Sequence, residues 1–203
     1  MQLQHALLEI AEIRERVATT QVFRGYRAPI AALSGGVAIA AAFLQDSFVP
    51  DPLHNLAAYV QLWSIVAAVA LVATAIDLGH RWLSDSSGRE RVRILTAVRA
   101  LAPCIVTGAL ATAVVVRSAP ELGWMLPAFW SLLFAQGVFA STPLLPRLAW
   151  WVGAYYVLAG LAALAAGADR PLAGWNMAIT FGIGQLLAAA ALYCSLERSH
   201  ASS

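Results

Sequence analysis

Five polar side chains lie within or at the ends of long apolar stretches, and they are the best candidates for chemistry in this sequence. Polar groups at membrane depth are costly, so they are kept mainly where they bind a solute, an ion or one another. Asp77 and Arg99 lie at a similar predicted depth, which predicts either a structural ion pair or a site that faces the cytoplasm. The other candidates are uncharged: Gln61, Gln136 and Gln185.

No pattern in the sequence is typical of a metal, haem or hydrolase site. The four histidines are scattered, and there is no HExxH, CxxCH or GxSxG pattern and no Walker-type glycine loop. We therefore expect no catalytic residue, no cofactor and no metal site, and a protein that is not an enzyme. Cys104 and Cys194 lie in separate apolar stretches without CxxC spacing, which predicts two buried, unreactive thiols.

A basic segment lies between two of the apolar stretches. Arginines beside a membrane surface attract anionic headgroups by about 1 kcal/mol each. The candidate contacts for anionic lipid are Arg89, Arg91 and Arg93, although setting the orientation of the chain also explains them. Because eleven acidic residues balance the thirteen arginines to a net charge of only +2, we expect no nucleic-acid partner, which requires a concentrated basic surface.

The composition predicts that membrane helices position these side chains. The chain has 203 residues, of which 60% are apolar and 12% are charged, and its mean hydropathy is +0.70. Soluble domains are about 45–50% apolar and about 25% charged. The apolar runs are too continuous for the alternating strands of a membrane barrel. We therefore expect an all-α, polytopic transmembrane helical bundle in contact with the lipid bilayer.

Six stretches have the length of a membrane span, which is about 20 residues. The membrane domain covers 23–198 and is followed by a short tail, 199–203. Asp46 and the prolines after it predict a turn, and Pro103 predicts a kink or a helix start. The predicted spans are 28–44, 56–76, 100–116, 124–140, 148–166 and 175–196.

The arginines predict the orientation of the bundle, because basic residues near span ends are retained on the cytoplasmic side. With the N-terminus inside, eleven of the thirteen arginines are cytoplasmic, and only Arg117 and Arg170 are outside. Both termini are then cytoplasmic, since the number of spans is even. The chain contains no lysine, a bias typical of GC-rich genomes, so we expect a multi-pass protein of a bacterial inner membrane.

Residues 1–22 have the pattern of a short amphipathic helix. Leu3, Leu7 and Ile10 recur at helical spacing, while Glu9 and Glu12 occupy the other face. The acidic start and the lack of a continuous apolar core argue against a cleaved signal peptide. The helix is expected to lie on the membrane surface or the bundle, or else to dock a protein partner.

Three glycines recur every seven residues in the fifth predicted span: Gly153, Gly160 and Gly167. Small residues allow helix backbones in lipid to approach closely. The stripe predicts tight packing within the chain, with a homo-oligomer interface as the alternative.

Four short motifs resemble an uncharacterised family of bacterial six-helix membrane proteins. They are Glu12 to Arg16 before the first span, Ala32 to Gly36 within it, Leu101 to Pro103, and Phe181-Gly182. The resemblance extends over nearly the whole chain. It implies a six-span inner-membrane fold and no particular activity.

Two functions remain as hypotheses. The preferred one is a non-enzymatic interaction or assembly module that uses the N-terminal helix and the arginine segment. The alternative is a small transporter or channel for an uncharged or lipid-like solute, lined by Gln61, Gln136 and Gln185.

Overall fold

The structure is a computed structural model that describes residues 28–84, 88–167 and 172–197. The predicted amphipathic helix at 1–22 and the tail at 199–203 lie outside the described residues. Every regular element in the described part of the chain is a helix, which confirms the predicted all-α class.

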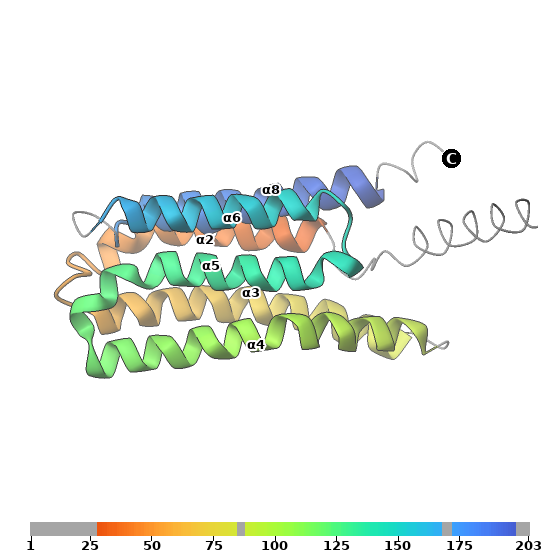
Figure 1. The fold of residues 1–203 in the computed structure, drawn as a ribbon, viewed down its shortest axis with the longest axis horizontal. Helices are drawn as coiled ribbons and strands as arrows, with labels where there is room; N and C mark the ends of the chain where they lie inside the picture. The colour runs from red at the N-terminus through yellow and green to blue at the C-terminus, as the bar shows by residue number, and fades with distance from the viewer. Residues whose placement is uncertain (1–27, 85–87, 168–171, 198–203) are drawn as a thin grey trace, which may run out of the picture.

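Long helices run up and down along one common direction (Figure 1). The first three are α2 (Ala28–Phe48), α3 (Leu56–Ser84) and α4 (Arg89–Ser118). A 3₁₀ helix, η1 (Pro120–Met125), leads into α5 (Leu126–Ser141), and η2 (Thr142–Leu144) precedes α6 (Ala149–Ala165). The last helical stretch consists of α7 (Gly174–Met177), the π-helical η3 (Ala178–Ile183), α8 (Gly184–Leu192) and the π-helical η4 (Tyr193–Glu197).

Several predicted spans were shorter than the observed helices. Hydropathy falls where charged residues begin, although the helix continues through them. Asp46 lies inside α2 and not in a turn, and the chain leaves the helix only before Pro50. The segment that starts at Arg89 forms the beginning of α4 and not a loop. Pro103 lies within α4 and does not mark its start, in keeping with the tolerance of membrane helices for proline.

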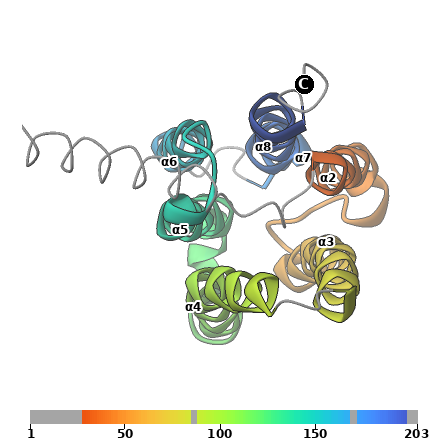
Figure 2. The same ribbon diagram turned by 90° about the vertical axis from the view of Figure 1, so that its right-hand side faces the viewer.

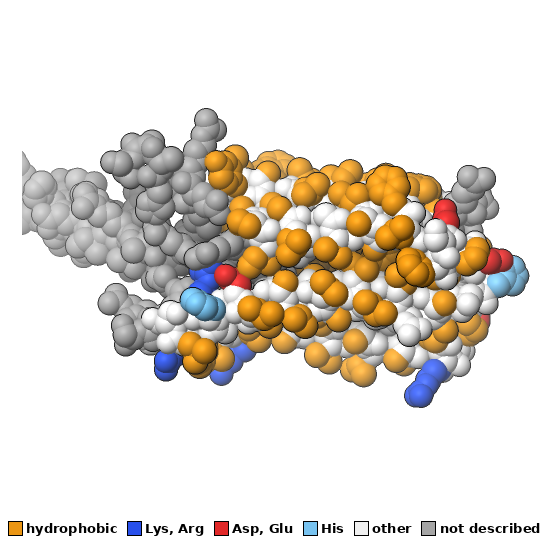
Figure 3. All heavy atoms as spheres, turned by 180° about the vertical axis from the view of Figure 1, so that it is seen from behind, with side chains coloured by type: hydrophobic (Ala, Val, Ile, Leu, Met, Phe, Trp, Pro, Cys, Tyr) orange, Lys and Arg blue, Asp and Glu red, His pale blue; other side chains and the backbone are white. Residues whose placement is uncertain are grey.

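Five helices of the described chain are long and apolar enough to cross a membrane: 28–48, 56–84, 94–118, 120–141 and 174–195. The sixth predicted span corresponds to α6, which is also apolar but has 17 residues. On the face of the bundle seen in Figure 3, apolar side chains are spread over the length of the helices, and charged side chains gather at the two ends. This distribution is typical of a protein surrounded by lipid.

Seen along its axis, the bundle is a ring in which each long helix packs on two neighbours (Figure 2). The order around the ring is α2, α3, α4, α5, α6 and α8, and α8 returns to α2. We call the end where α3 stops and α4 begins the arginine-rich end, and the opposite end, where α2 leads into α3, the Asp51 end.

Glycines allow the tightest contacts of the ring. A Cβ atom added to Gly35 of α2 would lie 2.9 Å from the carbonyl oxygen of Gly182 in η3, so this approach depends on the absence of a side chain at Gly35. Gly153 and Gly160 of α6 face α5 in the same way, against Phe139 and against Leu132 and the Ala128 carbonyl. Gly167 instead has a φ of 71° in the turn after α6. The stripe therefore serves packing within the chain, and a homo-oligomer stays a prediction.

The two helices α3 and α4 are packed far less tightly than the rest. Only 17% of the apolar part of α3 and 6% of that of α4 are buried, compared with 44% for the stretch Pro120–Ser141. Ile94 and Ala97 pack on Leu78 and Trp82 and join the two helices at the arginine-rich end. Between the ends, α3 and α4 face an open interior.

Candidate functional site

The interior of the ring contains a cavity of about 820 Å³. Its wall is formed by α2, α3, α4, α5, η3 and α8. Along α4 the lining residues run from Leu101 to Arg117, a rise of about 24 Å at 1.5 Å per residue. The hydrocarbon layer of a bilayer is about 30 Å thick, so the cavity extends through most of that depth.

Small side chains on facing helices leave this space open. Ala67 and Ala70 of α3 face the interior opposite Gly108, Ala109 and Ala113 of α4. In a soluble core, larger side chains would fill the gap at close to crystal density. Here the wall is predominantly apolar and suits a ligand with a large apolar surface.

Most hydroxyl groups in the wall are bound to their own helix. Ser34 donates to the Ile30 carbonyl at 3.0 Å, and Thr74 donates to the Ala70 carbonyl at 2.9 Å. Thr112 donates to the Gly108 carbonyl at 2.7 Å. No acidic residue is among the described residues that line the cavity, and Arg117 is the charged residue among them.

A network of aromatic and polar side chains fixes the wall near the Asp51 end. Trp63 Nε1 donates to Gln45 Oε1 at 2.9 Å, and Gln45 Nε2 donates to the Leu172 carbonyl at 2.7 Å. Trp130 Nε1 donates to Thr112 Oγ1 at 2.8 Å. The rings of Tyr59 and Trp130 are stacked, with centroids 6.2 Å apart and planes 5° apart. The network connects α2, α3, α4 and α5.

Gln45 was missed by the sequence analysis, which ended the first span at residue 44. Its side chain is fully buried. A signal for it exists, because the buried face of α2 continues at heptad spacing through Ala31, Gly35, Ala38, Ala42 and Gln45. The heptad spacing therefore extends this face one turn beyond the predicted span.

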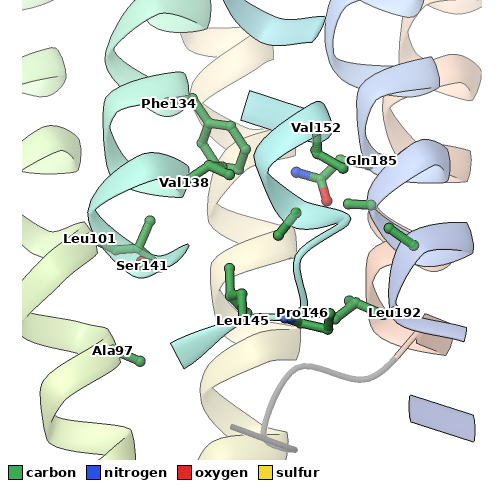
Figure 4. A pocket seen from close by; sticks show the side chains of 13 residues that line it. Ala97, Leu101, Phe134, Val138, Ser141, Leu145, Pro146, Val152, Gln185 and Leu192 are labelled. Carbon is green, nitrogen blue, oxygen red and sulfur yellow. The ribbon is translucent and has the colours of Figure 1, made fainter. Parts of the chain in front are cut away.

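A second, smaller cavity of about 60 Å³ lies nearer the arginine-rich end. Leu101, Phe134 and Gln185 line both cavities and so stand between them. Figure 4 shows Phe134 and Val138 of α5 on one side of the smaller cavity, with Gln185 and Leu192 on the other. The ring of Phe134 is held by Tyr156, at a centroid distance of 4.8 Å, and by Phe181, at 6.1 Å.

The three candidate glutamines do not come together. Gln61 of α3 and Gln136 of α5 are exposed and line neither cavity. Gln185 lines both and has no hydrogen bond to another side chain in the described part of the protein. A pathway lined by all three glutamines is therefore not formed.

Asp77 and Arg99 do not pair in the structure. The carboxylate of Asp77 accepts a hydrogen bond from Arg81 Nε at 2.9 Å, one turn along the same helix. These two side chains are 19% and 15% exposed, respectively, whereas Arg99 is exposed. Asp77 therefore forms a structural ion pair with Arg81 at the arginine-rich end.

One arginine of the basic segment joins the ends of α3 and α4. The guanidinium of Arg91 lies 5.5 Å from the ring centroid of Trp82, and its Nε donates to the Trp82 carbonyl at 3.2 Å. Arg89 and Arg93 belong to α4, but the structure does not describe their side chains. Contact with anionic lipid stays a prediction for all three.

The cysteines lie in different surroundings. Cys104 is half-buried and lines the large cavity, whereas Cys194 is exposed, so the prediction of two buried thiols was wrong for Cys194. Among the described residues, no group of three or more His, Cys, Asp or Glu side chains is placed to hold a metal ion.

No protein-family model, no curated protein and no solved structure matches this chain. The resemblance to the six-helix family stays a prediction.

Proposed function

We propose that the chain is a six-span protein of a bacterial inner membrane that binds an uncharged or lipid-like solute in its interior and transports it. The observation that carries the proposal is the pair of apolar cavities that share Leu101, Phe134 and Gln185. Together their linings extend from Arg117 near the Asp51 end to Leu145 and Pro146 near the arginine-rich end. A solute that follows this path stays inside the ring.

Length and charge support six spans with both termini in the cytoplasm. A helix of 17 residues such as α6 is about 25 Å long, so a thinned bilayer or flanking residues accommodate the difference from about 30 Å. The described arginines at one end include Arg81, Arg91, Arg99 and Arg147, and this end is then cytoplasmic by the retention of positive charge.

The chemistry of the wall supports a solute without net positive charge. A cation in an apolar interior needs an anionic partner, because burial of an unpaired charge is costly. The described lining residues include no carboxylate. Aromatic and aliphatic side chains instead offer dispersion contacts and exclusion of water, which suit a lipid chain or an apolar molecule.

The shared residues are the proposed gate. Leu101 lies close to Gly137, where an added Cβ would be 2.8 Å from a Leu101 methyl carbon. Rotation of Phe134 or Leu101 changes the connection between the cavities without moving a helix. The contacts of Phe134 with Tyr156 and Phe181 hold its ring in the position seen in the structure.

A vesicle assay tests the proposal. Purified protein is reconstituted with lysophosphatidylcholine, which has one acyl chain and here carries a fluorescent nitrobenzoxadiazole group, and dithionite bleaches only the outer leaflet. Wild-type protein is expected to expose the inner-leaflet probe. Ala109→Trp places an indole in the cavity and is expected to slow this exchange about fivefold, equivalent to about 1 kcal/mol.

The matched control is Ala111→Trp on the same helix, because Ala111 is exposed and does not line either cavity. Its exchange rate is expected to equal that of the wild type. Equal rates for the two variants, or no exchange by the wild type, would count against transport through the cavity.

The interaction-module hypothesis is a separate proposal. It depends on residues 1–22, which lie outside the described residues, and the cavities favour the solute-binding alternative. Deletion of residues 1–22 followed by pull-down from mild detergent tests it, since an unchanged set of partners contradicts docking through this segment.

A further inference from the structure

We infer that the ligand of the large cavity is a single-chain amphiphile whose oxyanion headgroup, a phosphate or a carboxylate, binds Arg117. The inference rests on the proposed function and narrows it to a class of solute. The apolar chain of the ligand extends from Arg117 toward Gln185.

Arg117 is placed to act as the headgroup contact. It is the charged residue in the described cavity wall and lies next to the last residue of α4, at the Asp51 end. Its side chain is exposed. The nearest acid along the chain, Glu121, makes no ion pair with it, and neither does any other described acid. The guanidinium is therefore free to bind an anion.

The position of Arg117 runs against the charge distribution of the rest of the chain. In the proposed orientation it lies on the non-cytoplasmic side, whereas Arg81, Arg91, Arg99 and Arg147 lie at the opposite end of the described bundle. Basic residues on that side oppose the retention of positive charge in the cytoplasm. Retention of positive charge in the cytoplasm therefore does not account for Arg117.

The tryptophan and threonine donors near this end of the wall are already engaged. The indole N–H groups of Trp63 and Trp130 donate to Gln45 and Thr112, respectively. The hydroxyl of Thr112 in turn donates to the Gly108 carbonyl. Near the Asp51 end, the strongest unused donor is thus the guanidinium, which binds phosphate and carboxylate through two parallel hydrogen bonds.

The shape of the cavity supports one long apolar chain. Gln185 lies at the opposite end of the wall from Arg117, beside the smaller cavity. The cavity lining rises by about 24 Å between Leu101 and Arg117, so the cavity is long in the direction of the membrane normal. Alanine, valine and leucine side chains line the intervening wall. An extended acyl or alkyl chain fits such a space, and its headgroup remains near the membrane surface.

Cys104 provides a reporter inside the cavity wall. In a Cys194→Ser background it is the single cysteine of the chain. The experiment measures the rate at which an apolar maleimide labels Cys104 in detergent. Hexadecyl phosphate, palmitate and hexadecanol are added as probes with chains of equal length and different headgroups.

The two anionic probes are expected to slow labelling at concentrations about tenfold lower than hexadecanol, because a charged hydrogen-bonded pair contributes roughly this factor. Arg117→Gln is expected to abolish the difference, and Arg117→Lys to retain part of it. Arg147→Gln is the matched control, since Arg147 is exposed and lines neither cavity. A stronger effect of one anion identifies phosphate or carboxylate as the headgroup.

Two results overturn the inference in distinguishable ways. Equal protection by all three probes, unchanged by Arg117→Gln, shows a ligand site without a headgroup contact and leaves the proposed function standing. If no probe protects Cys104, the cavity does not bind a lipid-like molecule, and the proposed function fails as well.

Discussion

Trp63 of α3 donates a hydrogen bond of 2.9 Å to the fully buried side chain of Gln45 in α2. The nitrogen of the same Gln45 amide, Nε2, donates to the backbone carbonyl of Leu172, which precedes the last helical stretch. One side chain thus connects three parts of the chain that are far apart in sequence. In lipid, where water does not replace lost hydrogen bonds, such a connection constrains how helices pack.

Gln45→Leu is expected to destabilise the protein by about 2 kcal/mol, because the Trp63 indole N–H and the Leu172 carbonyl lose their partner. Thermal unfolding in detergent measures the change. Gln61→Leu, on the exposed surface, is expected to stay within about 0.5 kcal/mol of the wild type. Equal unfolding temperatures for the two variants would show that the network does not stabilise the fold.

Gly35→Ala and Gly36→Ala form a second matched pair. At Gly35 the new methyl group would meet the Gly182 carbonyl at 2.9 Å, so overpacking is expected to cost about 1–3 kcal/mol. At Gly36 no atom lies within 4 Å of the new Cβ, and removing a helical glycine is expected to stabilise by about 0.5 kcal/mol. A lower unfolding temperature for Gly35→Ala and a higher one for Gly36→Ala would support the α2–η3 contact. A higher unfolding temperature for Gly35→Ala would contradict it.

Asp77→Asn is expected to destabilise by about 1 kcal/mol, since it removes the charge that faces the largely buried Arg81. Arg99→Gln is expected to leave stability unchanged, because Arg99 is exposed and does not pair with Asp77. Chemical unfolding of both variants in the same detergent separates these outcomes. If Arg99→Gln destabilised the protein more than Asp77→Asn, the result would support the predicted Asp77–Arg99 pair.

The stabilising contribution of the turn at the Asp51 end is expected to depend on pH. The backbone N–H of His54 donates to the Asp51 carboxylate at 3.2 Å and lowers the pKa of Asp51 below 3.8, with the His54 ring, 2.7 Å away, as a further cause. The stabilising contribution of the turn is therefore fully present above pH 3.8 and declines as the pH falls through the lower, folded pKa.

Carboxyl NMR of Asp51 checks this direction with two variants at one position. His54→Ala retains the backbone donor, so the pKa is expected to stay below 3.8. His54→Pro removes the N–H and is expected to bring the pKa back toward its ordinary value. A normal pKa in His54→Ala would instead assign the effect to the imidazole ring.

The helical architecture was largely predictable from hydropathy, and the helix ends were less so. The fifth predicted span, 148–166, agrees closely with α6, and the last, 175–196, lies within the continuous stretch from Gly174 to Glu197. The start of α4 was missed because the charged residues that follow Arg89 end a hydrophobic window without breaking a helix.

The cavity could not be predicted, because it depends on which faces of nonadjacent helices meet. The alanines of α3 and α4 suggest close packing when each helix is considered alone, and instead they border open space. Gln185 lines both cavities, whereas Gln61 and Gln136 are exposed on helix faces that line neither cavity. The depth of a side chain in the membrane can be read from the local sequence. The direction in which it points around the helix axis depends on which helices pack beside it.

The open interior also affects how such a protein evolves. A wall residue that borders empty space can gain volume at little cost to folding, as at Gly108, where a Cβ atom would meet Leu133 at an ordinary contact distance of 3.5 Å. Single substitutions at these positions therefore change what fits inside while the ring persists. Mutational drift in the wall can therefore change the shape of the cavity before it threatens the scaffold.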